Sequence, residues 1–351
     1  MSVFKYNERI KRRRRFRFAL IGLLFLLILT VVLSVGWYYQ SIKPYKPGEE
    51  STKIVTVDPG ATEDFIGTKL EDEEIIRSAI AYRLYLRLTR NQGTLQAGDY
   101  ELSPSMSVAE VVGTLSKGEI KTTLFTILPA RRIDQLEAQF KEAGYSEAEI
   151  IEALDADSYK GHPALADKPD SASLEGYLYP ESFQIIPSTP LKEIIKLSLD
   201  EMAEVLTPFL KADLQTNHGL TPHQAIILAS VVEREVSNPE DRGKVAQVFL
   251  KRYKENIALG SDPTALFGAV LFGLEPSVFT DTPYNTRLYP GLPPGPINNV
   301  SIESLRAVAD PAETDFLFFV SGDDGNTYFS NTQAEHEALA AQYCIELCRS
   351  Y

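Results

Sequence analysis

The chain has 351 residues, of which 44% are hydrophobic and 24% are charged, so it is globular material long enough for two domains and not a disordered polymer. Its net charge of −13 is uneven, because eight Lys or Arg against Glu8 give residues 1–17 a charge of +7 and leave −20 for the rest. The acidic remainder argues against nucleic-acid binding, which relies on Lys and Arg to neutralise phosphates.

An apolar segment follows the basic residues. Residues 18–39 contain no charged side chain and, as a helix, would span roughly 33 Å, enough for the core of a bilayer. Trp37 and Tyr38 at its far end fit an interfacial aromatic belt, and the preceding basic cluster predicts a cytoplasmic N-terminus. We therefore expect a single-pass protein of the cell membrane whose remaining residues are extracytoplasmic. A cleaved signal peptide is the alternative, disfavoured by the length of the segment and the lack of an A-x-A-like site.

Two segments are predicted next. Residues 40–50 are polar and contain prolines, which indicates a tether. Residues 51–128 twice show a strand, a turn and a helix, first at "KIVTVDPG" and then at a strand over 98–102, where Ser107 and Glu110 form a capping box before the second helix. "TTLFTIL" is a further strand. This plan predicts a small α+β module with a binding or spacer role.

The remaining chain is predicted as a helical linker, residues 129–170, and a larger domain, residues 171–351. The larger domain combines several helices with a hairpin at "DFLFFVSGDDGNTYFS", so the fold class is α+β with a short antiparallel sheet. Cys344 and Cys348 lie near the C-terminus. Two thiols are too few for a metal site, and the i, i+4 spacing is at the edge of disulfide geometry, so free or loosely paired thiols are expected.

A buried helix is predicted at residues 221–235. Thr221 and Gln224 form a capping box at its start. Residues 225–232 are apolar except for Ser230, and a helix that is apolar nearly all round is buried. The helix nevertheless ends with Glu233, which makes this carboxylate a candidate for chemistry.

Glu233 shares a helix face with small residues such as Ser230, which predicts open space in front of its carboxylate, whereas Glu235 lies about 200° away around the helix. A carboxyl in apolar surroundings has a raised pKa, as a general acid needs near neutral pH. Pairing of Glu233 with Arg234 or Arg242 is the structural alternative, and the sequence leaves both open.

At these residues the chain resembles the endolytic murein transglycosylases, the MltG or YceG-like family. The resemblance covers roughly residues 50–351 and four motifs in the family's order. The motifs are "LEGYLYPESF", "ILASVVEREVSNPEDRGKVAQVFLKRYKENIALGSDPTALFG", "TPYNTRLYPGLPPGPINN" and "DPAETDFLFFVSGDDGNTYFSNTQAEH". The resemblance implies a LysM-like module before the catalytic domain, and it implies that Glu233 is the catalytic residue. The chain departs from the family at Gly260, where Gln is frequent, and at Pro129-Ala130-Arg131, where "PEG" is usual.

Other polar residues become candidates for substrate contact. Asp262 would otherwise cap a helix, the residues around Asn285 would pack a loop, and Tyr177 would belong to a half-buried strand. The candidate substrate-binding residues are Asp262, Thr264, Tyr284, Asn285, Thr286, Ser230, Glu175 and Tyr177. His162, His218 and His223 lack metal-ligand spacing, and His336 is expected to pack locally, so neither metal nor cofactor is predicted.

The reaction that the resemblance implies is cleavage of the peptidoglycan glycan strand between N-acetylmuramic acid and N-acetylglucosamine. One glutamic acid protonates the leaving oxygen, and the muramic 6-hydroxyl then closes a 1,6-anhydro ring. Synthases of elongation or division are the partners that the family suggests. A hydrolytic muramidase and a non-catalytic scaffold that binds the cell wall are the alternatives.

Overall fold

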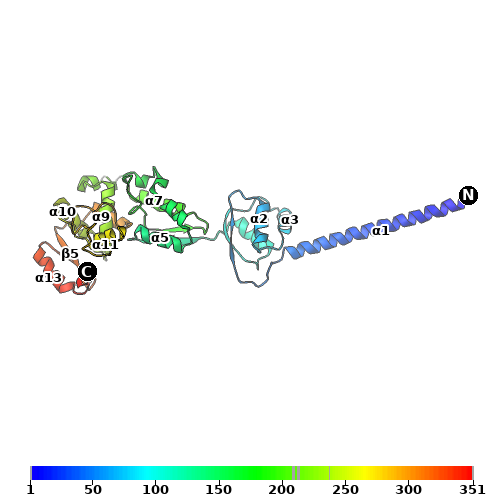
Figure 1. The fold of residues 1–351 in the computed structure, drawn as a ribbon. Coiled ribbons are helices and arrows are strands. Elements are labelled where there is room, and N and C mark those ends of the chain that lie inside the picture. The colour runs from blue at the N-terminus through cyan, green and yellow to red at the C-terminus, as the bar shows by residue number, and fades with distance from the viewer. Residues whose placement is uncertain (1, 208–209, 212–213, 237, 350–351) are drawn as a thin grey trace. The chain divides into compact units, whose positions relative to one another are not determined.

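A computed structural model describes residues 2–207, 210–211, 214–236 and 238–349, with side chains from residue 20 onward. The side chains of the basic residues 1–17, predicted to form a cytoplasmic tail, are therefore not among the described side chains. The chain divides into two compact units, Met1–Thr123 with Ile186–Ser188, and Leu124–Ile185 with Thr189–Tyr351 (Figure 1). Each unit has its own hydrophobic core.

The first unit begins with helix α1 (Ser2–Ser41). Its segment Leu20–Ser41 has a mean hydropathy of 2.7 and is unburied, so it is long and apolar enough to cross a membrane. This segment contains most of the predicted span 18–39. A signal sequence near an N-terminus would meet the same criteria of length and composition.

The segment after α1 is hydrogen-bonded to the rest of the first unit. Val108 N donates to Ile42 O (3.0 Å), and the Arg77 guanidinium donates to Tyr45 O (2.7 Å). Residues 40–50, predicted as a tether, are thus held at several points along their length, which include Pro44, Lys46 and Glu49.

The body of the first unit is a small sheet with three helices. Strands β1 (Lys53–Val57) and β2 (Gly98–Leu102) pair antiparallel, with α2 (Glu63–Asp72) and α3 (Ala79–Thr89) between them in the chain and α4 (Val108–Lys117) after them. The predicted strand at 98–102 and the capping box before α4 are confirmed. The two predicted strand–helix units form one β-α-α-β arrangement, because their strands pair with each other.

The second unit includes the region predicted as a linker. Strand β3 (Thr123–Thr126) pairs with β4 (Ser182–Ile185). Helices α5 (Ile133–Glu142) and α6 (Glu147–Leu154) bury apolar side chains in the second core. Residues 129–170 are therefore packed as part of this unit.

Helix α9 (Pro222–Glu235) packs against α10 (Arg242–Lys254), α11 (Asp262–Leu271) and α12 (Ile302–Ala309). Figure 1 shows α9 beside α10 and α11. The elements before α9 are η1 (Ala156–Tyr159), η2 (Pro163–Leu165), α7 (Leu191–Val205) and η3 (Leu214–His218). Those after it are η4 (Pro239–Asp241), α10 (Arg242–Lys254), α11 (Asp262–Leu271), α12 (Ile302–Ala309), β5 (Phe318–Ser321), β6 (Thr327–Ser330), α13 (Gln333–Tyr343) and η5 (Leu347–Arg349). Strands β5 and β6 form the predicted antiparallel hairpin, so the mixed α+β class is confirmed.

Helix α9 begins as its sequence predicts. Gln224 N donates to Thr221 Oγ1 (3.2 Å), and Thr221 N donates to Gln224 Oε1 (3.0 Å). The residues from Ala225 to Glu233 are all buried. The helix is thus fixed by a capping box at one end and by an apolar surface along its length.

Cys344 and Cys348 are joined by a disulfide, which corrects the prediction of free or loosely paired thiols. Helix α13 ends at Tyr343, so the two cysteines do not share a helix. Their Cα atoms lie 5.4 Å apart, well inside the range of ordinary disulfides.

Gly268 allows a loop to approach α11 closely. A Cβ atom at this position would lie 2.2 Å from Thr282 Oγ1 and 2.9 Å from Tyr284 Cβ. Gly268→Ala should therefore lower the free energy of unfolding by about 1–3 kcal/mol, measured by urea unfolding. Gly243→Ala is the matched control, because its Cβ would meet Ala312 N at an ordinary 3.4 Å. Equal losses in the two variants would contradict the close approach.

Candidate functional site

Glu233 is held by three hydrogen bonds, and its side chain is 3% exposed. Arg242 Nη2 donates to Oε1 (3.2 Å), while Ser301 donates to Oε2 from both its backbone N (3.1 Å) and its Oγ (2.6 Å). The arginine pairing that the sequence left open is therefore present, with Arg242. Both carboxylate oxygens accept hydrogen bonds, and Glu233 lines neither of the two cavities described below.

The small residues beside Glu233 admit another part of the chain. Ile297 N donates to Ser230 Oγ (3.0 Å), and Asn298 Nδ2 donates to Ser230 O (2.8 Å). Ser230, predicted to contact substrate, is fully buried and holds this segment. The segment continues to Ser301, the N-cap of α12, which places the Glu233 carboxylate at a helix N-terminus, where negative charge is favoured.

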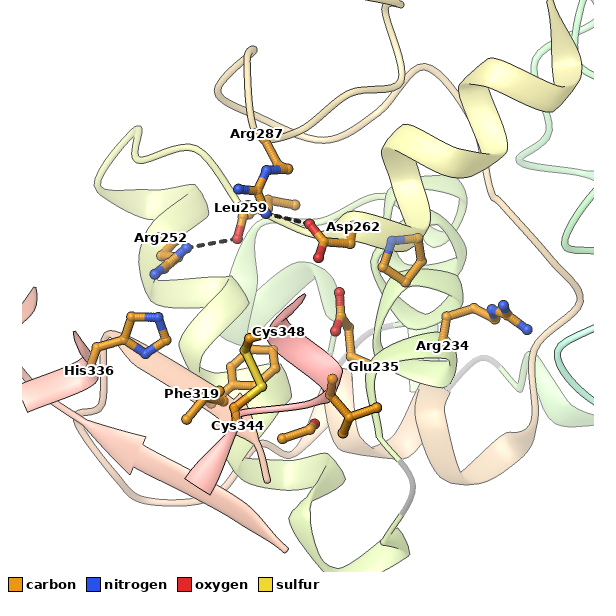
Figure 2. A pocket seen from close by; sticks show the side chains of 15 residues that line it. Arg234, Glu235, Arg252, Leu259, Asp262, Arg287, Phe319, His336, Cys344 and Cys348 are labelled. Atoms are coloured by element: carbon orange, nitrogen blue, oxygen red, sulfur yellow. Dashed lines mark hydrogen bonds and ion pairs between the residues drawn. A yellow bond between two sulfur atoms is a disulfide. The ribbon is translucent and has the colours of Figure 1, made fainter. Parts of the chain in front are cut away.

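A cavity of about 450 Å³ lies at the C-terminal end of α9. Figure 2 shows the Glu235 side chain reaching into it, near Asp262 and the disulfide. Its lining residues come from α9, α10, α11, the β5–β6 hairpin and the C-terminal segment. They are Arg234, Glu235, Arg252, Leu259, Gly260, Asp262, Pro263, Arg287, Phe319, Val320, Ser321, His336, Cys344, Leu347 and Cys348.

Burial raises the pKa of Glu235 to about 7. The Ser261 side chain acts against this rise as a hydrogen-bond partner, as do the charges of Arg234 and Arg252, whereas the charge of Asp262 adds to it. A carboxyl with a pKa near 7 can give up and regain a proton at neutral pH, which suits general acid–base chemistry. The sequence analysis placed Glu235 on a different helix face from Glu233 and gave it no role.

Asp262 is the one predicted substrate-binding residue among the described lining residues of this cavity. Its carboxylate pairs with Arg287, and both side chains are partly exposed (Figure 2). It is the first residue of α11, and the N-cap is Ser261, so Asp262 does not serve as the predicted cap.

Three other candidates, Thr264, Asn285 and Thr286, are buried and do not line the described cavity. Thr264 Oγ1 donates to Ser261 O (2.6 Å) and lies 2.8 Å from Thr286 Oγ1. Asn285 Nδ2 donates to Val278 O (3.0 Å). All three side chains are buried, and these hydrogen bonds hold the loop against α11.

Two aromatic candidates are also structural. The ring of Tyr284 packs on Phe267, with centroids 5.0 Å apart. Tyr177 is buried and its hydroxyl hydrogen-bonds to His223 Nδ1 (2.7 Å). Neither tyrosine lines the described cavity.

Glu175 is a second glutamate with a raised pKa. Burial raises its pKa to about 8, although Ile133 N donates to Oε2 (3.0 Å) and acts against that shift. Glu175 is 9% exposed and does not line the described cavity. The protonated carboxyl of Glu175 is therefore a buried group of the fold and does not face the cavity at Glu235.

Arg252 and His336 form one wall of the cavity. Arg252 donates to Leu259 O (2.8 Å), as Figure 2 shows. Its guanidinium also lies over the ring of Phe318, 4.9 Å from the centroid. His336 stacks on the same ring at 5.4 Å, as local packing predicts. Burial lowers the pKa of His336, so at neutral pH the wall carries the charge of Arg252 alone.

The C-terminal segment that lines the cavity is held at two places. The disulfide joins Cys344 to Cys348, and the Asp323 carboxylate accepts backbone N–H groups from the intervening residues at 2.7–2.9 Å. These donations lower the pKa of Asp323. These contacts hold the C-terminal segment in place as part of the cavity wall.

A second cavity, of about 440 Å³, adjoins the first at Arg234, which lines both. Its other lining residues are Leu128, Pro129, Ala130, Arg131 and Gln135. Among the described residues, no group of three or more His, Cys, Asp or Glu side chains is arranged to hold a metal ion.

Comparisons with known proteins place these features in a family. Residues 55–342 match the model of the YceG-like family. An endolytic murein transglycosylase of Bacillus subtilis (strain 168) is 28% identical over 322 residues, covering 86% of this chain and 88% of the relative. A protein of the same name from Streptococcus pneumoniae (strain D39) is 27% identical over 355 residues, and the chain spans 64% of its length. The crystal structure of a yceG-like protein from Listeria monocytogenes has a TM-score of 0.53 at 27% identity, covering 83% of this chain and 100% of that one.

Arg242→Gln should lower the free energy of unfolding by about 3 kcal/mol, because it leaves the buried Glu233 carboxylate without its cation. Thermal or urea unfolding measures the loss. Arg287→Gln is the matched control, since its ion pair with Asp262 is partly exposed and should contribute less than about 1 kcal/mol. Equal unfolding curves for the two variants would refute the structural role of Arg242.

Glu175 should make stability depend on pH. Its pKa is about 8 in the fold and about 4.3 in an unfolded chain, so its contribution is present at acid pH and is lost as pH rises through 8. Glu175→Gln, which stays neutral, should lose less unfolding free energy than the wild type between about pH 5 and pH 8. Glu147→Gln, at an exposed position on α6, should keep the wild-type dependence. An unchanged slope in Glu175→Gln would contradict burial of this proton.

Proposed function

The chain belongs to the YceG-like family, and on that premise we propose that it is an endolytic lytic transglycosylase of peptidoglycan. Curated relatives over most of its length carry the name endolytic murein transglycosylase. The proposed reaction cleaves the bond between N-acetylmuramic acid and N-acetylglucosamine and leaves a 1,6-anhydro end.

The observation that carries this proposal is the position of Glu235. Its carboxyl lines the cavity at the end of α9, and burial raises its pKa to about 7. We therefore assign the general acid to Glu235. Glu233, the acid that the sequence predicts, has both oxygens engaged by Arg242 and Ser301, so we assign it a positioning role on the same helix.

The proposed mechanism needs one carboxyl that changes its protonation state twice. Glu235 gives its proton to the glycosidic oxygen as the bond from that oxygen to C1 breaks. The resulting carboxylate takes the proton of the muramic 6-hydroxyl while that oxygen bonds to C1. Glu235 ends the cycle protonated, and no water is consumed.

A hydrolytic muramidase is the second candidate, because Asp262 lines the same cavity. Most glycoside hydrolases use two carboxyl groups, one as acid and one as nucleophile or as base for water. The Asp262 carboxylate is already engaged by Arg287, so it is less free to hold a water molecule for attack on the sugar. This contact supports the transglycosylase over the hydrolase.

The first unit supports a cell-wall-binding role beside the membrane. Its β-α-α-β arrangement with a two-stranded antiparallel sheet fits the LysM-like module that the family plan implies. We propose that α1 anchors the chain in the cell membrane with the N-terminus in the cytoplasm, since Leu20–Ser41 is long and apolar enough. Partnership with elongation or division synthases stays a prediction.

Glu235→Gln should lower kcat on intact peptidoglycan by about 10²–10⁴-fold, because the amide cannot donate the proton. Glu233→Gln is the matched variant and should keep more activity, since the amide still accepts from Ser301. Both variants are compared at equal folded fraction, judged by circular dichroism. If Glu233→Gln were inactive while Glu235→Gln still cleaved, the acid would be Glu233.

Mass spectrometry of the products should find 1,6-anhydro ends. Products heavier by one water molecule would indicate the hydrolase instead. A full-length wild-type chain that released neither product would leave the scaffold alternative.

The dependence of kcat/KM on pH should report the protonation of Glu235. The acid must be protonated at the start of the cycle, so kcat/KM should fall as pH rises above about 7. Steady-state kinetics across that range measure this limb. A fall already complete below about pH 5 would indicate an ordinary, solvated carboxyl.

A further inference from the structure

The second cavity presents cationic groups that the fold does not use. Arg131 and Arg234 line it, both are exposed, and within the described residues neither has an ion-pair partner. The neighbouring Arg132, by contrast, pairs with Asp134 at 2.8 Å. Guanidinium groups without a carboxylate partner in a concave site are suited to bind an anion from outside.

The loop that carries Arg131 is held in place by a buried side chain. Asn299 is 1% exposed, and its Oδ1 accepts from Arg131 N (2.8 Å) while its Nδ2 donates to Leu128 O (3.0 Å). Asn299 N also donates to Arg131 O (2.9 Å). These three hydrogen bonds from Asn299 hold the backbone of residues 128–131 in place without a ligand, so binding would cost little backbone conformational entropy in this loop.

The second cavity also offers an amide and an apolar surface. Gln135 Oε1 accepts from Arg132 N (3.1 Å), which leaves its Nε2 to donate. Leu128 is 46% exposed although it is a large apolar side chain. Cation, amide donor and exposed apolar surface together match a short peptide that carries carboxylates and methyl groups.

Arg234 links this cavity to the proposed acid. It lines both cavities and directly precedes Glu235, and Figure 2 shows its side chain extending away from the Glu235 carboxylate. A ligand bound at Arg131 and Arg234 would therefore lie beside a glycan strand bound at Glu235.

We propose that the second cavity binds a carboxylate of the peptide stems carried by the glycan strand, through Arg131 and Arg234. The site rests on the proposed function, because the strand at Glu235 supplies the stems. It makes the chain prefer strands that still carry peptide over strands from which an amidase has removed it.

The test compares these two substrates with the full-length chain in detergent. The wild type should show a KM about tenfold lower for stem-bearing strands than for stripped strands, as expected for one charge-assisted contact. Arg131→Gln should bring the KM ratio close to one, and Arg131→Lys should restore part of it. Arg132→Gln is the matched control and should keep the wild-type ratio, because Arg132 is paired with Asp134 and does not line the cavity.

The outcomes separate this site from the proposed function. Equal wild-type KM values for the two cleaved substrates would overturn the stem site and leave the transglycosylase intact. Cleavage of neither substrate would overturn the function. In that event, calorimetry of a soluble muramyl peptide binding to the full-length chain tests the stem site by itself. Loss of binding in Arg131→Gln but not in Arg132→Gln would support the stem site. No binding to the wild type would overturn it.

Discussion

The ion pair between Glu233 and Arg242 is the constraint on which the candidate site depends. A carboxylate that is 3% exposed would be costly without compensation, and here a guanidinium and two donors of Ser301 provide it. These contacts join α9 to the start of α10 and to the N-terminus of α12. The end of α9 is thereby fixed in direction, and that end carries Glu235.

Residues near the C-terminal end of α9 therefore face different surroundings. Ser230 and Glu233 face the interior and hold the segment 297–301, whereas Arg234 and Glu235 face the two cavities. The same segment contains Asn299, which fixes the loop at residues 128–131. One buried stretch of chain, residues 297–301, thus supports the end of α9 that carries Glu235, the proposed acid, and the wall of the adjoining cavity, so a change in it would disturb both.

Local sequence patterns predicted the helices and the hairpin well. The candidate site was harder to predict, because it depends on contacts between residues far apart in the sequence. The capping box at Thr221, the buried run of α9 and the hairpin follow from neighbours in sequence. The helical periodicity separated Glu233 from Glu235 correctly, but it could not show that a segment nearly 70 residues away fills the space beside Ser230. Small residues on a buried helix face admit either a ligand or another backbone, and only the packed fold distinguishes them. The Cys344–Cys348 bond escaped prediction for a related reason, since it depends on where α13 ends.

The hydrogen bonds at Ile42 and Tyr45 join the segment after α1 to the first residue of α4, Val108, and to Arg77. A transmembrane helix tilts in response to the thickness of the surrounding bilayer. In a bilayer, a flexible linker after α1 would absorb that tilt, whereas this hydrogen-bonded segment would transmit part of it to the first unit. Lipid composition would then act as a mechanical input to the orientation of this unit at the membrane surface.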